Sequence, residues 1–385
     1  MVVNSTNEND RLLAMSLKIA FVAGCPYPVP QGSQAFIREN ALALRKRGHE
    51  IHLIVYGYGT NHSTDNFQIH RGPNIPGENR TSAGPSIKKI WLDLLMVKTV
   101  QRVCREQNIQ ILFAHNYEGL IIALMSGFRP IIYHAHNAMS DELPYYFDRG
   151  KDFFHLLGRY MDRKFPQKAD YIITPHERLG ANLLLKGIKK EKLRIIPPPV
   201  DAESFPISQI KKDTLPPILY TGNLDQYQNL DFLYRVIERV RKEIPETRLI
   251  IGTFEKQKIQ GAEVVHIGTF DSLKKLLEDD SIMAIPRVSW SGYPIKLLNA
   301  MASGKPAVCC ESSAYGIKNG VNGMVVADND VESFAQSLIT LMRTPSLREE
   351  LGKNARNTIQ TQHNPEIIGK VLEDLCLSCI QKQLT

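Results

Sequence analysis

The chain has 385 residues, of which 43% are hydrophobic and 23% are charged. This length predicts two or three domains, and the composition is typical of a soluble globular protein. It excludes collagen, coiled coils and mostly disordered chains, and no apolar run is long enough to span a membrane. The net charge of +7 is uneven, because residues 1–200 contain 26 Lys+Arg and 17 Asp+Glu whereas residues 201–385 contain 21 and 23. Such an asymmetry bears on binding partners rather than on the fold.

The two ends of the chain carry no clear functional signal. Residues 1–16 are polar and lack the basic and apolar regions of a secretory signal, so we expect a disordered extension and a cytoplasmic protein. Cys376 and Cys379 form a C-x-x-C pair within a helical pattern. Without a second ligand pair, we interpret them as buried apolar residues rather than as a redox or zinc site.

Strands and helices alternate through the first half of the chain. Apolar strands are predicted at 17–24, 49–57, 109–116, 130–137, 169–177 and 193–201, with helices at 36–48, 119–127 and 180–187. Apolar strands without polar alternation are typical of a parallel sheet covered on both faces. This half therefore predicts a Rossmann-like domain over residues 17–200.

The same alternation restarts after a polar, proline-rich linker. Strands are predicted at 216–223, 247–254, 263–270, 281–288, 305–312 and 323–330, with an amphipathic helix at 230–245. We therefore expect an α/β fold with a second Rossmann-like domain over 201–365 and a helix at 366–385 that packs back on the first domain. Ligands of such sheets bind at the carboxyl ends of the strands, here in the cleft between the domains.

Candidate site residues of the first half follow predicted strands. Gly32 and Ser33 lie in a turn before a helix, where backbone N–H groups can bind an anion. His115-Asn116 ends one strand, and His134-Ala135-His136-Asn137 ends the next. No carboxylate or thiol joins these histidines at ligand spacing, so we expect no metal.

The second half has two further candidate segments. Gly222 and Asn223 end a strand before a helix. Residues 291–294 (Ser-Gly-Tyr-Pro) precede a helix at 295–304, and Ser291 is predicted to be its N-terminal cap. Lys296 and Asn299 are three residues apart, so both belong to one side of that helix.

In combination, these segments resemble the retaining family 4 type of GT-B glycosyltransferase. The resemblance rests on the Gly-Ser-Gln loop at 32–34, His-Ala-His-Asn at 134–137, the segments 195–205 and 220–225, SGYPIKLLNAMASGKPAV at 291–308, and NGVNGMVVADND at 319–330. It extends over nearly the whole chain. It implies two Rossmann-like domains, a nucleotide-sugar donor and no bound metal or other cofactor.

The resemblance also implies roles for individual residues. His136 would face the transferred sugar and act catalytically, together with Lys296. The donor would contact Gly32, Ser33, Gly222, Asn223, Arg287, Ser291, Gly292, Tyr293, Pro294, Ile295 and Asn299. The acceptor would lie near His115, Asn116 and Asn137.

Two departures from the family pattern stand out. The family's Glu-x7-Glu pair is replaced by Ser291 and Asn299, and no Arg or Lys follows Gly222 where the family grips the diphosphate. A diphosphate without counter-charge is unfavourable in a partly dry cleft. We therefore expect Lys296, Arg287 or an arginine of the first domain to supply the charge, with weak or lost donor binding as the alternative.

The implied reaction is sugar transfer from UDP- or GDP-sugar to an acceptor hydroxyl, with the departing phosphate oxygen taking the acceptor proton. Glycans and lipids are the acceptors considered. Two alternatives are a sugar-nucleotide epimerase, which would need paired acids in the cleft, and a non-catalytic scaffold that binds a nucleotide sugar or a partner transferase.

Aromatic and basic residues alternate over 145–168. We interpret this segment as a helix packed on the sheet with a solvated basic face; the alternative is an interfacial helix that touches anionic lipid. A second candidate for lipid contact covers 80–98, around Trp91. The aromatic residues form no stacking platform and no recognised motif is present, so we expect no nucleic-acid partner.

Overall fold

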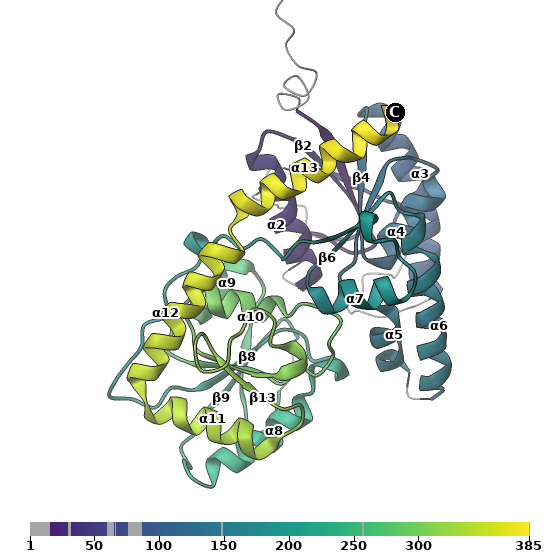
Figure 1. Ribbon diagram of the computed structural model, residues 1–385. Helices are drawn as coiled ribbons and strands as arrows, with labels where there is room; N and C mark the ends of the chain where they lie inside the picture. Colours follow the sequence, from purple (N-terminus) through teal and green to yellow (C-terminus); the bar gives the residue numbers. More distant parts are fainter. Residues whose placement is uncertain are drawn as a thin grey trace, which may run out of the picture.

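The computed structural model describes residues 16–29, 32–59, 65, 67–75, 87–147, 149–255 and 258–384. The extension predicted at 1–16 lies outside these ranges except for Ser16. The chain folds into two lobes, each built on one parallel sheet with helices on its faces (Figure 1). This confirms the predicted α/β architecture of two Rossmann-like domains in tandem.

The first lobe contains a seven-stranded parallel sheet in the order β3-β2-β1-β4-β5-β6-β7. Its strands are β1 (Lys18–Ala23), β2 (Glu50–Val55), β3 (Gln68–Arg71), β4 (Ile111–His115), β5 (Ile131–His134), β6 (Tyr171–Thr174) and β7 (Leu193–Ile195). Ala23 pairs with His115, and His115 pairs with His134. The carboxyl ends of the three central strands are therefore level, and their last side chains share one edge of the sheet.

The helices of this lobe are α2 (Gly32–Lys46), α3 (Ile87–Glu106), α4 (Asn116–Ser126), α5 (Met139–Glu142), α6 (Lys151–Lys164) and α7 (Glu177–Leu185). Two apolar cores lie against the sheet: Phe21, Ile37 and Leu44 belong to the core on the α2 side, and Leu92, Val100 and Leu120 to the other. Gly119 permits the close packing of α4, because a Cβ at this position would lie 2.3 Å from the carbonyl oxygen of Val22.

The second lobe contains a six-stranded parallel sheet in the order β10-β9-β8-β11-β12-β13. The strands are β8 (Ile218–Thr221), β9 (Leu249–Thr253), β10 (Glu263–His266), β11 (Ile282–Ile285), β12 (Ala307–Cys310) and β13 (Met324–Val326). The helices are α8 (Leu230–Arg241), α9 (Phe270–Glu278), α10 (Ile295–Ala302), α11 (Val331–Arg343) and α12 (Pro345–Gln362). Phe232 of α8 and Phe334 of α11 meet edge to face in the core of this lobe.

The chain crosses between the lobes twice, and the two crossings are hydrogen-bonded to each other. Val200 N donates to the carbonyl oxygen of His363 (2.8 Å), and His363 Nδ1 lies 2.7 Å from the carbonyl oxygen of Pro198. Beyond the second crossing, α13 (Pro365–Leu384) lies beside α2 in the first lobe (Figure 1). Cys376 and Cys379 are buried there in the apolar core, as predicted.

Helix α6 differs from our first interpretation of residues 145–168. It packs against α5 rather than on the sheet, and it buries only Gly158 and Asp162 fully. A Cβ at Gly158 would lie 2.4 Å from the carbonyl oxygen of Met139, so the glycine permits this close packing. Phe153, Leu157 and Tyr160, which were expected to face the sheet, are exposed instead.

Candidate active site

A cavity of about 210 Å³ lies between the lobes, where the carboxyl ends of both sheets meet. Gly32 is the first residue of α2, and Ile295 is the first residue of α10. The two residues lie close together across the cavity, because a Cβ added at Gly32 would lie 3.7 Å from Ile295 Cγ1. Both helices therefore begin at the cavity, where their first N–H groups favour an anion.

Most of the predicted site residues line this cavity. They come from segments far apart in the sequence: Gly32, Ser33, His136, Asn137, Gly222, Asn223, Arg287, Gly292, Tyr293, Pro294, Ile295, Lys296 and Asn299. Ser291, His115 and Asn116 do not belong to the lining. The fold therefore gathers the glycine turns, the strand-end histidine and two cations around one space.

Lys296 supplies a cation beside Gly222. Gly222 has a φ of 128°, and a Cβ there would lie 2.9 Å from Lys296 Nζ. The ammonium donates to Gln228 Oε1 (2.8 Å) and lies 3.8 Å from the ring centroid of Tyr220. Burial, with a smaller contribution from Arg287, holds the pKa of Lys296 well below its usual value. An anion in the cavity would restore the charged form.

Arg287 supplies a second cation from the loop after β11. Its Nε and Nη2 donate to the carbonyl and hydroxyl oxygens of Ser289 (both 3.1 Å), and the guanidinium lies over the ring of Tyr227. A Cβ at Gly292 would lie 2.6 Å from Arg287 Nη2. Only a residue without a side chain lets the guanidinium lie this close to the backbone.

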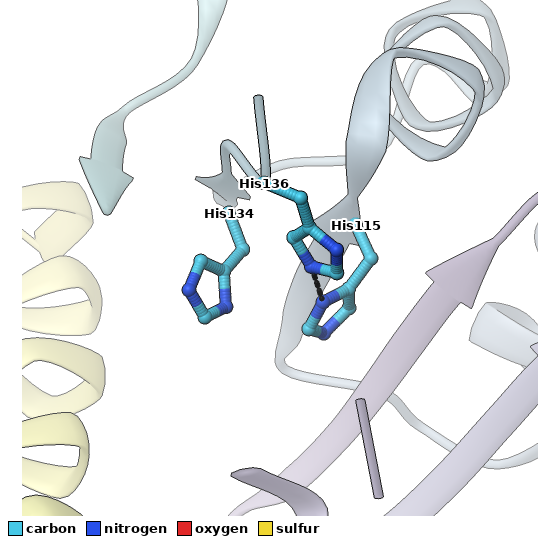
Figure 2. Close-up of side chains that lie close together, drawn as sticks. All are labelled: His115, His134 and His136. Carbon is cyan, nitrogen blue, oxygen red and sulfur yellow. Dashed lines mark hydrogen bonds between the residues drawn. The ribbon is translucent and has the colours of Figure 1, made fainter. Parts of the chain in front are cut away.

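Three histidines meet beneath the cavity at the ends of β4 and β5. His115 Nδ1 lies 3.0 Å from His136 Nε2, with His134 beside them (Figure 2). His136 lines the cavity, and burial lowers its pKa to about 3. The pKa values of His115 and His134 are also lowered, chiefly by burial. The imidazole of His136 is therefore neutral, with its Nε2 hydrogen-bonded to His115 and its Nδ1 buried.

One ring nitrogen from each of His115, His134 and His136 lies within 4.8 Å of the other two, a spacing that could hold a metal ion. Metal-bound histidines usually donate their second ring nitrogen to a carboxylate or carbonyl group. Here His115 Nε2 and His136 Nδ1 are buried without a hydrogen-bond partner in the part of the chain that is described. The rings pack instead against Phe21, Phe36 and Phe113. An aromatic shell offers no counter-charge to a cation, and both ring nitrogens of His134 are likewise buried without a hydrogen-bond partner among the described residues.

The expectation that Ser291 caps helix α10 is wrong. Helix α10 begins at Ile295 with Pro294 at its N-cap position, and no side chain caps it. Ser291 is fully buried, and both its hydroxyl (2.7 Å) and its backbone amide (3.1 Å) donate to Asp141 Oδ2 in the first lobe. A carboxylate from the other lobe therefore attracts the serine away from the helix and out of the cavity lining.

His115 and Asn116 also lie elsewhere than expected. His115 has no exposed surface and contacts His136 rather than the cavity. Asn116 is the first residue of α4 and has a φ of 58°. Of the predicted acceptor-side residues His115, Asn116 and Asn137, only Asn137 lines the cavity, together with His136.

Sequence reasoning missed Glu142, which also lines the cavity from the end of α5. Burial raises the pKa of its carboxyl group to about 7, and the Tyr146 hydroxyl donates to it. Thr221 and Thr253, the last residues of β8 and β9, were missed as well. Their strand-end positions are the signal that could have identified them.

Two family descriptions match the chain. Residues 30–204 match Glycosyltransferase Family 4, and residues 216–344 match Glycosyl transferases group 1. An uncharacterized glycosyltransferase of Haemophilus influenzae is 24% identical over 339 residues, which cover 82% of this chain and 88% of the relative.

Solved structures agree in fold. Sucrose-phosphate synthase from Thermosynechococcus elongatus superposes with a TM-score of 0.76 at 16% identity, over 96% of this chain and 99% of that one. HepE of Anabaena, solved in complex with UDP-glucose, gives 0.73 at 14% identity, over 94% and 100%. With the two family matches on successive lobes, they show that the chain belongs to the GT-B glycosyltransferases of the family 4, or group 1, type.

Proposed function

We propose that this glycosyltransferase transfers a sugar from a UDP- or GDP-sugar to the hydroxyl group of a glycan or lipid-linked acceptor, with retention of configuration and without a metal ion. The observation that carries the proposal is the interlobe cavity, which combines two helix N-termini, Lys296 and Arg287 beside a neutral His136. The relative HepE, solved with UDP-glucose, supports a nucleotide-sugar donor.

Lys296 and Arg287 would supply the positive charge that the segment after Gly222 lacks. The loop after β8 carries no cation, but Lys296 reaches Gly222 from α10, and Arg287 reaches the same cavity from the loop after β11. A diphosphate beside Gly222 would lie between the ammonium and the start of α10. Preorganised cations and N–H groups of this kind stabilise a departing phosphate without a metal ion.

The reaction needs few groups from the protein. The diphosphate leaves the anomeric carbon as the acceptor hydroxyl attacks from the same face, so the configuration is retained. The departing phosphate oxygen accepts the hydroxyl proton, which makes a separate base unnecessary. His136, held by His115, contacts the sugar and positions it for transfer.

We further propose that the enzyme works at an anionic membrane surface. No helix within the described ranges has the length and hydropathy needed to cross a bilayer. The first lobe nevertheless exposes Ile90 and Trp91 on α3 and Phe153, Leu156 and Tyr160 on α6. Exposed apolar residues among cations are typical of surfaces that bind at the membrane interface.

A donor screen and a transfer assay test this function. Thermal shifts with UDP, GDP and ADP should show stabilisation by one nucleotide, because a ligand of the folded state raises the melting temperature. Incubation of the matching nucleotide sugars with candidate acceptors should release nucleotide, and proton NMR of the product should show the donor's anomeric configuration. An inverted product would refute the retaining mechanism, and binding without turnover would favour the scaffold.

The Lys296→Met variant tests the donor site directly. Charge-assisted hydrogen bonds contribute about 1.5–3 kcal/mol, so donor affinity should fall by about ten- to a hundredfold. Lys242→Met is a matched control, because Lys242 is exposed and lies outside the cavity lining. Equal affinities of the two variants would remove Lys296 from the donor site.

A further inference from the structure

A second cavity, of about 590 Å³, lies in the first lobe beside the cavity between the lobes, which is called the donor cavity from here on. It is formed by α5, α6 and α7 with Trp290 of the second lobe. Its lining residues are Ser140, Asp141, Pro144, Tyr145, Lys151, His155, Arg159, Asn182, Leu185, Lys186 and Trp290. Asp141 connects the two cavities, because its Oδ2 accepts a 2.8 Å hydrogen bond from Ser289 Oγ, and Ser289 lines the donor cavity.

One broad side of helix α6 carries both its buried residues and its cavity-lining residues. Gly158 and Asp162 are buried against α5. Lys151, His155 and Arg159 follow at intervals of four residues and line the second cavity. Residues four apart lie one above the other on a helix, so these three side chains form one row.

The charged residues of this cavity lie at two opposite ends. Lys186 forms an ion pair with buried Asp162, and Asp141 accepts hydrogen bonds from Ser289 and Ser291. Within the described ranges, neither Lys151 nor Arg159 has a carboxylate at ion-pair distance. The end near α6 is therefore cationic, while the end near the donor cavity carries a carboxylate that can accept a hydrogen bond from a sugar hydroxyl.

The middle of the cavity offers polar and aromatic contacts. Asn182 Oδ1 is buried and has no hydrogen-bond partner in the described part of the chain. Trp290, with Arg178 stacked 5.0 Å from its ring centroid, and Tyr145 contribute aromatic surface. An acceptor oxygen without a partner and fixed aromatic rings suit a hydroxylated ring such as a sugar.

An apolar strip adjoins the cationic end. Phe153, Leu156 and Tyr160 of α6 are 64%, 60% and 58% exposed, and Leu185, which also lines the cavity, is 89% exposed. Leu156 follows His155 and Tyr160 follows Arg159 in the sequence, and the strip is centred about 130° around α6 from the row of Lys151, His155 and Arg159. A molecule that leaves the cavity past Arg159 would meet this apolar surface.

We infer that the second cavity binds the head of a lipid-linked acceptor in which a phosphate joins the sugar to an apolar chain. This inference rests on the proposed function and names its acceptor class. The acceptor sugar lies between Asp141 and Trp290, next to the donor cavity, the phosphate binds Lys151 and Arg159, and the chain runs over Phe153 and Leu156 into the bilayer. Charge complementarity selects the phosphate, and the apolar strip selects the lipid.

Vesicle binding without nucleotide sugar tests the site independently of turnover. Phosphatidylcholine vesicles that contain polyprenyl phosphate are compared with vesicles that contain phosphatidylglycerol at equal surface charge. The wild type should prefer the polyprenyl phosphate vesicles by at least about tenfold, which corresponds to about 1.4 kcal/mol. K151A/R159A should lose this preference. R163A/K164A removes two exposed cations of the same helix outside the cavity lining, and should weaken binding to both vesicles alike.

Two control experiments identify the source of the phosphate and test whether the variants are folded. Inorganic phosphate at the concentration of the lipid phosphate should not displace the protein, whereas displacement would overturn the lipid-linked acceptor. K151R/R159K keeps both charges and should retain the preference, which excludes loss of fold as the cause. Equal binding to both vesicles, or an equal loss in the two alanine double variants, would overturn the site. Failure of the transfer assay would leave these binding results unchanged.

Discussion

The hydroxyl of Ser291 in the second lobe donates a 2.7 Å hydrogen bond to Oδ2 of Asp141 in the first. The backbone amide of Ser291 and the hydroxyl of Ser289 donate to the same oxygen, and Ser291 is fully buried. Ser291 stands where the resemblance places the first glutamate of the Glu-x7-Glu pair. In this chain the position joins the two lobes and lies outside the cavity lining.

Restoring the family residue at this position should therefore harm the enzyme. Ser291→Glu would bury a second carboxylate against Asp141, and like charges in a dry site are strongly unfavourable. We expect a clear fall in melting temperature and at least about tenfold lower transfer activity. Asn299→Glu is the matched control, because it introduces the same carboxylate at a residue that lines the donor cavity. A Ser291→Glu variant as stable as Asn299→Glu would contradict the lobe-joining role.

His136 and His115 should differ in their effects on catalysis. In the proposed mechanism His136 contacts the sugar, so His136→Ala should lower turnover far more than donor affinity. His115 acts through His136, and His115→Phe keeps the aromatic packing on Phe21 while deleting the 3.0 Å hydrogen bond. We expect kcat to fall by about tenfold with the donor KM unchanged. Unaltered turnover in His136→Ala would remove this residue from the mechanism.

The parts of this site that the sequence predicts share one physical origin. Gly222 and His136 follow closely after apolar strands that are buried on both faces, and parallel strands bring their carboxyl ends to one edge of a sheet. Edge strand β3 was missed because its residues are only half-buried and lack an apolar run. Local hydrophobic patterns therefore predict the central strands, which the sheet buries on both faces, but not a half-buried edge strand.

Other features depend on contacts between segments distant in sequence. Serine is a residue type that often caps helices, yet the Ser291 hydroxyl donates instead to Asp141, which is 150 residues away in the sequence. Glu142 lines the donor cavity only because α5 lies between the lobes. The row of Lys151 and Arg159 had a helical spacing, but which face of α6 is buried depends on the close packing of Gly158 on Met139. No local signal carries such information.

Donor affinity should fall as the pH rises through about 7. Burial raises the pKa of Glu142 to about 7, so below this pH its carboxyl group is neutral and above it a carboxylate faces the donor phosphates. Glu142→Gln should remove most of this dependence, measured as donor Kd by calorimetry on both sides of pH 7. Lys296 acts in the same direction, because its pKa is lowered in the free protein and rises when a phosphate binds. His136, with a pKa of about 3, should not contribute. A donor affinity that is independent of pH would contradict both assignments.

Glu373 should anchor the C-terminal helix to the first lobe. It is 7% exposed on α13, and its carboxylate lies 2.6 Å from Arg47 Nε and 3.0 Å from His49 Nε2. Glu373→Gln keeps the volume but removes the charge that pairs with Arg47, so we expect a loss of about 1–3 kcal/mol in the free energy of unfolding. Asp374→Asn, the same charge change at the exposed neighbouring residue, should alter it by less than about 0.5 kcal/mol. Because multidomain chains seldom unfold in two states, hydrogen exchange of the α13 amides is the decisive measurement. Faster exchange in Glu373→Gln alone would show that this carboxylate holds α13 on α2, whereas equal exchange in both variants would assign the attachment to Leu372 and Cys376 in the apolar core.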